Sequence, residues 1–349
     1  MNQKIIITED QDLAVELSRA IEELNPKGIF VLCDETTRKM CFSRIQTIPE
    51  IQKAPVHTIG AGDSHKNLDT LSSVWQFLCE NGATRHSVLI NLGGGMVTDL
   101  GGFAASTFKR GMRYINIPTT LLGAVDAAVG GKTGINFNGL KNEIGVINPA
   151  SHVIIDTLFF GTLDIYNKLS GYAEILKHGL IFSKEEWTKV LQFDVERFDL
   201  IELRQILRDS INVKQQIVKK DPFEKNIRKA LNFGHTIGHA IESLSHEKND
   251  PVLHGYAVAW GLVAELYLSH ALLGFSRECV SQAKAYIQET YGKPKFISCK
   301  DYDRLFELMR HDKKNMSCDQ ISFTLLSDFG QVQTDQFVDQ KLLFEAIEY

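Results

Sequence analysis

The sequence predicts two domains, an α/β domain over residues 1–165 and an all-α domain over residues 166–349. Three observations support this division. In the first half, short β-rich runs alternate with amphipathic stretches, which is typical of βαβ units and a largely parallel sheet. From about Tyr166 the apolar residues recur with helical period and β-rich runs become scarce. Three consecutive glycines, Gly93, Gly94 and Gly95, separate one β-rich run from a helical stretch.

The expected strands of the first half are short apolar runs bounded by Gly, Pro, Asn or Asp. They lie at 5–7, 29–33, 88–92, 114–117 and 153–155, and helices are expected at 13–24, 68–80 and 96–107. The run that begins at Val88 is almost wholly apolar, which indicates a strand covered on both faces. In the second half we expect helices over 169–182, 184–193, 200–220, 227–245, 252–273, 276–291 and 301–311, and a short strand at 320–326.

The bulk composition is that of a soluble globular protein, with 44% hydrophobic and 23% charged residues. The 38 basic and 43 acidic residues give a net charge of −5 with no basic stripe, so we expect no nucleic-acid partner. We find no segment that approaches the roughly 20 continuous apolar residues needed to span a bilayer. The N-terminal MNQKIIITED does not read as a secretory signal. We therefore expect no membrane partner, a cytoplasmic location and, since no cysteines are paired as CxxC, free thiols.

The three glycines suggest a binding site for a dinucleotide. Glycines between a strand and a helix let backbone N–H groups approach a pyrophosphate, which then lies at the positive end of the helix. The spacing is not GxGxxG, so a plain tight turn is the alternative. Asp34 follows the second expected strand and is placed either to accept from a ribose hydroxyl or to cap a helix. Thr119 and Thr120 follow another expected strand and could offer hydroxyls beside the same groove.

The segment 118–145 combines six glycines with one Asp and two Lys. We interpret this backbone freedom beside charges as a loop that wraps N–H and ammonium groups around an anion. Lys132, Lys141 and Asn142 are therefore candidates for phosphate or nucleotide contacts. The alternative is a solvated, flexible loop.

Histidines and one glutamate in the second half suggest a metal site. His235 and His239 are spaced i, i+4 on one helix face, as are Glu174 and His178, with Lys177 beside them. His254 opens another helical stretch. A carboxylate and two imidazoles from three helices would leave an open position on Zn²⁺, as catalytic zinc requires. The order is not HExxH, which gives a zinc protease no support, and the spacing does not decide whether His235 and His239 both bind metal.

Taken together, these motifs resemble those of the 3-dehydroquinate synthase family. They occur in the family's order, with near-family spacing, over about residues 28–330. The motifs are GGGMVTDLGGFAAS, RG at Arg110, PTTLLGAVDAAVGGKTGIN, KNEIG, AEILKHG, LNFGHTIGHAIE, HG at His254 and DKKN at 312–315. The resemblance implies a dehydroquinate synthase-like fold, in which a Rossmann-like NAD-binding domain precedes an all-α metal-binding domain.

The resemblance also implies roles for individual residues. The metal, Zn²⁺ or Co²⁺, would be held by Glu174, His235 and His254. The residues expected against NAD are Asp34, Asp63, Lys66, Gly94, Gly95, Asp99, Thr119, Thr120, Lys132 and Lys141. The residues expected against the substrate are Asp126, Lys132, Asn142, Lys177, Lys214, Glu224, Arg228, Asn232, His239 and either Lys313 or Lys314. Arg110 would reach a neighbouring subunit, which implies a homodimer.

The implied reaction, a step of the shikimate pathway, converts 3-deoxy-D-arabino-heptulosonate 7-phosphate to 3-dehydroquinate and phosphate. It would run through transient oxidation by NAD, β-elimination of phosphate, re-reduction and intramolecular aldol closure, so the enzyme would be a phosphorus–oxygen lyase. Such a substrate is a small phosphorylated keto acid. Its phosphate and carboxylate need cations, which Arg110, Lys132, Lys177, Lys214 and Arg228 would supply.

Three other interpretations stay open. A sister sugar-phosphate cyclase of the valiolone or inosose type would use the same metal and NAD on a substrate without a carboxylate. A metal-dependent polyol dehydrogenase would accumulate NADH and would not need the cations, and a non-catalytic regulatory protein would lack a ligand or the cations. The chain departs from the usual family pattern at Asp63, Thr98, Gly123, Ala124, Ala127, Ala128 and Tyr256.

Overall fold

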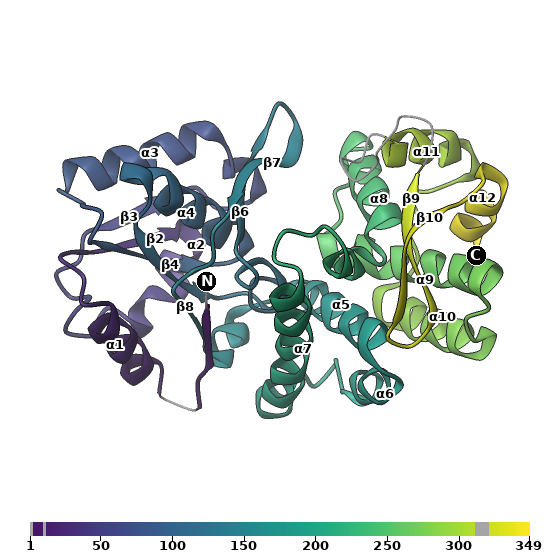
Figure 1. Ribbon diagram of the computed structural model, residues 1–349, viewed down its shortest axis with the longest axis horizontal. Helices are drawn as coiled ribbons and strands as arrows, with labels where there is room; N and C mark the ends of the chain where they lie inside the picture. The colour runs from purple at the N-terminus through teal and green to yellow at the C-terminus, as the bar shows by residue number, and fades with distance from the viewer. Residues whose placement is uncertain (1–2, 10–11, 311–320) are drawn as a thin grey trace. The chain divides into compact units, whose positions relative to one another are not determined.

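The computed structural model describes residues 3–9, 12–310 and 321–349 (Figure 1). The chain divides into two compact units, Met1–Lys168 and Leu169–Tyr349. The first is an α/β unit and the second is mainly helical, so the predicted fold class is confirmed. We call them the N-terminal unit and the C-terminal unit.

The N-terminal unit is built on a six-stranded, wholly parallel sheet in the order β1-β8-β5-β4-β2-β3. Its strands are β1 (Lys4–Ile7), β2 (Ile29–Asp34), β3 (Val56–Ile59), β4 (Val88–Gly93), β5 (Arg113–Pro118) and β8 (His152–Ile155). Every residue of β4 is buried, as its apolar sequence predicts for a central strand covered on both faces. The order reverses between β2 and β4, and ligands of such sheets bind beyond the carboxyl ends of the strands at this switch point.

Helices cover both faces of this sheet (Figure 1). They are α1 (Leu13–Leu24), α2 (Glu35–Met40), α3 (Leu68–Glu80) and α4 (Gly95–Thr107). The predicted bounds of α1 and α3 are confirmed. The helix α3 begins where Asn67 accepts a hydrogen bond from the Thr70 N–H at 2.9 Å, which is the usual way to satisfy a free donor at a helix start. The edge strand β3 was not predicted, because His57 and Thr58 interrupt its apolar run. The helix α2 was not predicted, because its six residues are too few to show a helical period.

The interpretation of segment 118–145 as a glycine-rich loop is wrong for most of its length. After a π-helical turn at η4 (Gly123–Ala127), the chain forms an antiparallel hairpin of β6 (Lys132–Phe137) and β7 (Leu140–Ile147). Asn138 and Gly139 both have positive φ, 49° and 78°, as a two-residue hairpin turn requires. A Cβ on Gly145 would lie only 2.1 Å from the Thr133 carbonyl oxygen. The glycines therefore serve the turn and the close approach of the two strands.

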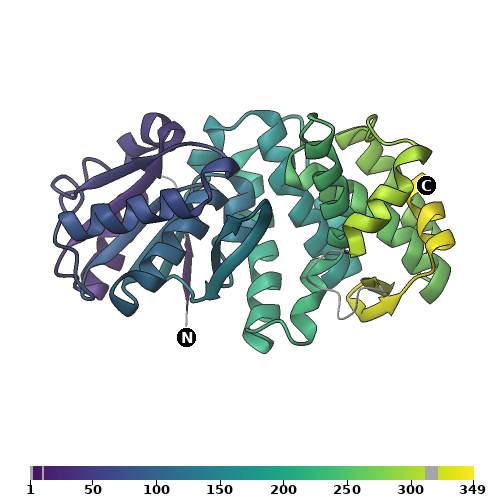
Figure 2. The ribbon, with the colours of Figure 1, turned by 90° about the horizontal axis from the view of Figure 1, so that it is seen from above.

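The C-terminal unit is a helical layer with one antiparallel hairpin, seen from above in Figure 2 with the hairpin in yellow. Its helices are α5 (Ile165–Phe182), α6 (Lys184–Gln192), α7 (Leu200–Lys220), α8 (His235–Glu247), α9 (His254–Leu273), α10 (Arg277–Tyr291), α11 (Tyr302–Arg310) and α12 (Gln340–Glu348). The hairpin strands are β9 (Ser322–Asp328) and β10 (Gln331–Phe337). The helix expected over 227–245 is interrupted at Gly234, whose φ of 79° is not helical, so that η6 (Ile227–Asn232) precedes α8.

Two expectations from the bulk sequence are affected by the structure. The expectation that no segment could span a bilayer needs correction, because α9 is long and apolar enough by length and composition, with a mean hydropathy of 1.3. However, 61% of that stretch is buried inside the unit, as in the core helix of a soluble protein. The cysteines in the described residues (Cys33, Cys41, Cys79, Cys279 and Cys299) are free, as expected.

Candidate metal centre and dinucleotide turn

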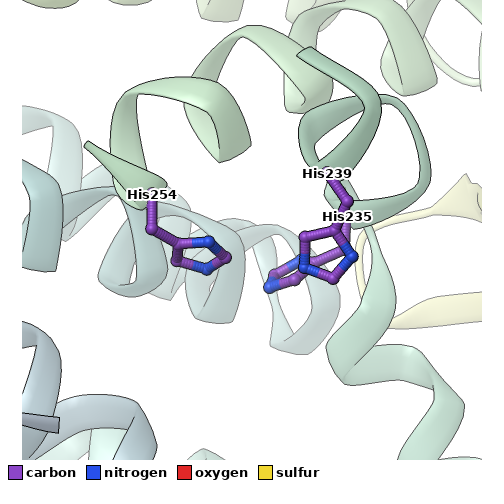
Figure 3. A group of neighbouring side chains, drawn as sticks. All are labelled: His235, His239 and His254. Carbon is purple, nitrogen blue, oxygen red and sulfur yellow. The ribbon is translucent and has the colours of Figure 1, made fainter. Parts of the chain in front are cut away.

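Three helices of the C-terminal unit present the predicted metal ligands. Glu174 lies in the middle of α5 and is fully buried, whereas His235 and His254 are the first residues of α8 and α9. One ring nitrogen from each of His235, His239 and His254 lies within 4.8 Å of the other two, and Figure 3 shows the three rings pointing toward a common space. Glu174 lies beside His235 and His254, so residues up to 80 positions apart in sequence lie close together.

The geometry around Glu174 matches a metal site. Its Oε1 lies 3.3 Å from His235 Nε2 and 3.6 Å from His254 Nε2. Ligand atoms around tetrahedral Zn²⁺ are separated by roughly 3.3–3.6 Å, since each lies about 2.0–2.2 Å from the ion. Among the described residues, this buried oxygen has no hydrogen-bond partner. A buried carboxylate oxygen without a donor is costly, and a cation between the three atoms would satisfy it.

The other ring nitrogen of each histidine is already used. His235 Nδ1 lies 3.1 Å from the carbonyl oxygen of Phe233, and His254 Nδ1 lies 3.1 Å from Glu242 Oε2. Because both partners can only accept, each Nδ1 carries the proton and donates it. When both rings are neutral, as a bound metal would require, the Nε2 lone pairs face Glu174.

Glu242 is a residue that the sequence analysis missed. It lies seven positions after His235 on the same face of α8, and this i, i+7 spacing could have identified it. Burial lowers the pKa of His254, but the carboxylates of Glu174 and Glu242 outweigh burial and raise it to about 10 in the absence of a metal. Glu242 thus both orients the imidazole and increases its basicity.

Lys177 lies one turn after Glu174 and forms a buried ion pair with its Oε2. Burial would raise the pKa of Glu174, but the Lys177 ammonium and then His235 outweigh burial and hold it well below its usual range. Glu174 is therefore ionised. His178, expected on the same face, lies instead 2.7 Å from Ser210 Oγ of α7 and is not part of the histidine group.

His254 is also held by close backbone packing. The N–H of Gly255 donates to Ser170 Oγ of α5 at 3.1 Å, and a Cβ at Gly255 would lie 1.9 Å from the Ser170 carbonyl oxygen. Only glycine therefore allows α9 to begin this close to α5. Tyr256, where the family usually has Glu, packs edge-on against Tyr291 with 5.2 Å between ring centroids.

Other predicted substrate residues of the C-terminal unit lie near η6. Asn232 Nδ2 donates to Glu224 Oε1 at 3.0 Å, and Glu224 has a positive φ of 58°. Arg228 is buried, and its Nη1 donates to the Pro222 carbonyl oxygen at 2.6 Å. Lys214 is buried on α7. Lys313 and Lys314 lie outside the described residues.

In the N-terminal unit, the glycine turn joins β4 directly to α4 at the switch point of the sheet. Gly94 is the N-cap of α4, and no side chain caps the helix. A Cβ at Gly94 would lie 3.0 Å from Thr120 Cγ2, and one at Gly95 would lie 3.2 Å from Ala127 Cβ. The turn is narrow, and side chains at these positions would fill the space in front of the first turn of α4. Such a helix start suits a phosphate.

Asp34 serves as a helix cap, the alternative considered for it. Its Oδ1 accepts from the Thr37 N–H at 2.8 Å, and its own N–H donates to Thr37 Oγ1 at 3.0 Å. Thr37 Oγ1 also lies 3.1 Å from the carbonyl oxygen of Leu92 in β4. The start of α2 is thereby tied to the strand that leads into the glycine turn. The cap uses Asp34 Oδ1. That Oδ2 accepts from a ribose hydroxyl stays a prediction.

Five further predicted residues of the N-terminal unit form one polar cluster. Lys66 is buried, and its Nζ donates to Asp99 Oδ2 at 2.5 Å and to Asn142 Oδ1. Lys141 Nζ lies 3.8 Å from Asp63 Oδ2, and both side chains are exposed. The cluster links α4 to the hairpin, so Asn142, expected against the substrate, lies among residues expected against NAD.

The remaining predicted residues of this unit are more dispersed. Thr119 is buried, and Thr120 Oγ1 accepts from the Gly123 N–H at 3.0 Å. Asp126 is half-buried in η4, and Lys132 is exposed at the start of β6. Arg110 is exposed and has a left-handed φ of 67°, a strained conformation for a residue with a side chain.

Comparisons with known proteins cover nearly the whole chain. The family profile described as "3-dehydroquinate synthase N-terminal" matches residues 56–169, and "3-dehydroquinate synthase C-terminal" matches residues 171–315. A 3-dehydroquinate synthase from Parabacteroides distasonis is 52% identical over 347 residues, which cover 99% of this chain and 97% of that protein. A 3-dehydroquinate synthase from Pyrococcus furiosus is 37% identical over 94% of each chain.

Solved structures share the fold at lower sequence identity. A 2-deoxy-scyllo-inosose synthase in complex with carbaglucose-6-phosphate, NAD⁺ and Co²⁺ matches with a TM-score of 0.85 and 24% identity, covering 98% of this chain and 95% of that one. A 2-epi-5-epi-valiolone synthase from Streptomyces hygroscopicus with NAD⁺ and Zn²⁺ bound matches with a TM-score of 0.86 and 24% identity, covering 100% and 96%. At these identities the likeness establishes the fold only.

Proposed function

The chain belongs to the 3-dehydroquinate synthase family, and we propose that it converts 3-deoxy-D-arabino-heptulosonate 7-phosphate to 3-dehydroquinate and phosphate. The observation that carries the proposal is the position of Glu174 Oε1, 3.3 Å from His235 Nε2 and 3.6 Å from His254 Nε2. It supports a divalent metal site. The relatives named 3-dehydroquinate synthase match this chain over nearly their whole length. We assign the dinucleotide to residues 1–165 and the metal and substrate to residues 166–349.

The residues present suit both cofactors that are bound in the two solved structures. Glu174, His235 and His254 would hold Zn²⁺ or Co²⁺, and the start of α4 at Gly94 and Gly95 would receive the NAD pyrophosphate. When bound, a divalent metal lowers the pKa of a hydroxyl that it ligates, and NAD⁺ accepts hydride from the carbon that carries this hydroxyl. NAD would act as a catalytic cofactor that is not consumed, because the hydride would be returned before the product forms.

The other assigned residues bind charge and move protons. Lys177 neutralises the second oxygen of Glu174, which keeps the carboxylate ionised inside the unit. Lys214 and Arg228 are buried cations near η6, and we assign them to the phosphate and the carboxylate of the substrate. We assign to His239 an imidazole nitrogen that faces the substrate and exchanges a proton with it, since its ring lies 5.3 Å from that of His235 by centroids. Elimination and aldol closure need mainly positioning of the bound molecule.

We also propose a homodimer, in which Arg110 reaches the neighbouring copy. Two features support an interface on the N-terminal unit. Arg110 is exposed in a strained conformation that a contact would justify. The strand β7 carries four exposed apolar side chains, Leu140, Ile144, Val146 and Ile147, each at least 38% exposed. Light scattering behind size exclusion should give twice the chain mass of 39.3 kDa, and a monomer at micromolar concentration would contradict this proposal.

The activity is tested with purified protein, the heptulosonate phosphate, Zn²⁺ or Co²⁺, and NAD⁺ at a small fraction of the substrate concentration. We expect many phosphates released per NAD⁺ and no net accumulation of NADH. Release of one phosphate per NADH formed would contradict the catalytic use of NAD. Turnover of a sedoheptulose phosphate instead of the keto acid would favour a sister cyclase, and NADH formation from glycerol would favour a polyol dehydrogenase.

A further inference from the structure

We propose that Glu265 is a positioning residue that acts on His235 through the peptide group between Phe233 and Gly234. Glu265 lies on α9 with no exposed surface and belongs to none of the sets described above. It is a single carboxylate within an apolar helical stretch, AVAWGLVAELYL, where a buried charge requires partners. The inference rests on the metal site of the proposed function and concerns how that site is held.

Backbone N–H groups at the start of α8 converge on this carboxylate. The Gly234 N–H donates to Glu265 Oε2 at 2.6 Å, and the N–H groups of Thr236 and Ile237 donate to Oε1 at 3.0 and 3.2 Å. The N-cap residue of α8 is Gly234, which has no side chain to cap the helix. Glu265 therefore performs from a different helix the function that Ser, Thr or Asp usually performs locally.

The peptide group between Phe233 and Gly234 connects this cap to the metal ligand. Its N–H is held by Glu265, and its carbonyl oxygen, that of Phe233, accepts from His235 Nδ1 at 3.1 Å. A peptide group is planar and rigid, so fixing its N–H also fixes the direction of its carbonyl oxygen. That oxygen sets the rotation and the tautomer of the His235 ring, whose Nε2 lies 3.3 Å from Glu174 Oε1.

The same chain of hydrogen bonds keeps the Nδ1 proton of His235 in place. A carboxylate that accepts from a peptide N–H polarises the peptide, which makes its carbonyl oxygen a stronger acceptor. The stronger acceptor holds the Nδ1–H group, so the Nε2 lone pair stays directed at Glu174 Oε1. Glu265 thus influences His235 across a peptide group, as Glu242 influences His254 directly.

Close packing prevents the turn from compensating by a shift. A Cβ at Gly261 would lie 2.1 Å from the Gly234 carbonyl oxygen, so the backbones of α9 and the turn are in direct contact. Glu265 follows Gly261 by about one helical turn and His254 by about three, which places all three on one side of α9. Each of the two helices therefore supplies a carboxylate to the other. Glu242 of α8 contacts His254, and Glu265 of α9 contacts the turn before His235.

The test is the affinity of Glu265→Gln for Co²⁺ and Zn²⁺, measured by competition with a chromophoric chelator. Gln is similar in shape but loses the charge, and its NH₂ group must face at least one of the converging N–H donors. We expect metal affinity to fall about 10- to 100-fold, as for other partners of metal-binding histidines, and the visible absorption of the Co²⁺ protein to change. The matched control is Ser269→Ala, which removes a buried hydroxyl one turn further along α9 that bonds to Leu326 N–H at 3.0 Å. It should lower thermal stability but leave metal affinity within twofold.

A double-mutant cycle separates positioning from general stability. If Glu265 acts through His235, Glu265→Gln should weaken metal binding by less than twofold when His235→Ala is already present. An equal loss in both backgrounds would overturn the proposal, as would a Glu265→Gln affinity within twofold of the parent. Failure of the parent itself to bind one metal ion per chain would instead overturn the metal site of the proposed function, and this inference with it.

A measurement on the unaltered protein covers the case in which Glu265→Gln does not fold. With ¹⁵N-glycine labelling, the Gly234 amide proton should resonate far downfield, because it donates to a carboxylate at 2.6 Å. Metal binding to His235 strengthens the Nδ1–H donor and should move this amide proton further downfield. A Gly234 resonance that stays unchanged on metal binding would overturn the proposal.

Discussion

The histidine group of the C-terminal unit and the glycine turn of the N-terminal unit would bind their proposed ligands by opposite means. The first collects ionised and neutral side chains from α5, α8 and α9, each held by a further partner such as Glu242 or Lys177. The second offers backbone N–H groups at the start of α4, where Gly94 caps the helix without a side chain. A metal ion needs fixed lone pairs, whereas a pyrophosphate needs donors that it can approach. The two regions should therefore respond to different kinds of substitution.

The largest expected effect is that of Glu174→Gln. Loss of the carboxylate removes a metal ligand and leaves Lys177 buried without its ion-pair partner, a change that typically costs about 3–5 kcal/mol. We expect bound metal to disappear and the rate of phosphate release to fall at least about 1000-fold, about 4 kcal/mol in activation free energy. Metal content by elemental analysis and NAD⁺ affinity by fluorescence check this, with exposed Glu185→Gln as the control. Retention of one metal ion per chain would contradict the ligand assignment.

The complementary change in the other region is Gly94→Val. A branched side chain 3.0 Å from Thr120 Cγ2 fills the space in front of α4, so the dissociation constant of NAD⁺ should rise about 10- to 100-fold, about 1.4–2.7 kcal/mol. Metal affinity should not change. The neighbouring Met96→Leu conserves volume and should leave both affinities as they are. Calorimetric titration with each ligand measures the effect, and equal NAD⁺ affinity in Gly94→Val would move the dinucleotide away from this turn.

A third prediction concerns protons released by metal binding. Without metal, Glu174 and Glu242 outweigh burial and hold the pKa of His254 at about 10, so its imidazole is protonated at pH 7–8. A metal binds only the neutral ring, hence about one proton must leave, and apparent metal affinity should rise about tenfold per pH unit up to that pKa. Titration in buffers of different ionisation enthalpy counts the protons. Glu242→Gln should reduce the proton count and the pH slope, and a pH-independent affinity between 7 and 9 would contradict the assignment.

The smallest expected effect is that of Asp34→Asn. Asn caps a helix about as well as Asp, so the melting temperature should change little, whereas Asp34→Ala should lose about 1 kcal/mol of unfolding free energy. If the second carboxylate oxygen accepts from a ribose hydroxyl, NAD⁺ affinity should fall several-fold in Asp34→Asn. Thermal unfolding and NAD⁺ titration of both variants check this. Unchanged NAD⁺ affinity would leave Asp34 with its capping role alone.

The sequence predicted the long periodic elements and the metal ligands for the same reason. A stretch such as α3 or α7 repeats its pattern over several turns, and the pairing of His235 with His239 depends on helical spacing alone. The residue pattern indicated a carboxylate and two imidazoles from three helices, whereas the choice of Glu174, His235 and His254 as the set came from the family resemblance, since nothing local relates α5 to α9. Side chains spaced along regular helices were therefore the part of the candidate site that the sequence predicted most readily.

The sequence did not predict the β6–β7 hairpin or the role of Glu265. The dipeptide Asn138-Gly139 is a strong hairpin signal, yet the surrounding glycines were attributed to a ligand. Glycine spacing cannot distinguish space for another strand from space for a phosphate. Glu265 was hidden for a different reason. A lone acidic residue in an apolar stretch indicates that a partner is present, but the backbone N–H groups that bind Glu265 have no sequence signature.

The helix α9 is buried on most sides, with 61% of its apolar stretch enclosed and no pronounced polar face. The apolar surface of α9 is kept from contact with other chains only while α8, α10 and β9 pack around it. Once heat opens the C-terminal unit, the helix exposes a surface that associates with other chains faster than the unit can close again. Inactivation on heating should then be irreversible and dependent on protein concentration, so the useful lifetime of the protein is set by the rate at which this helix is uncovered.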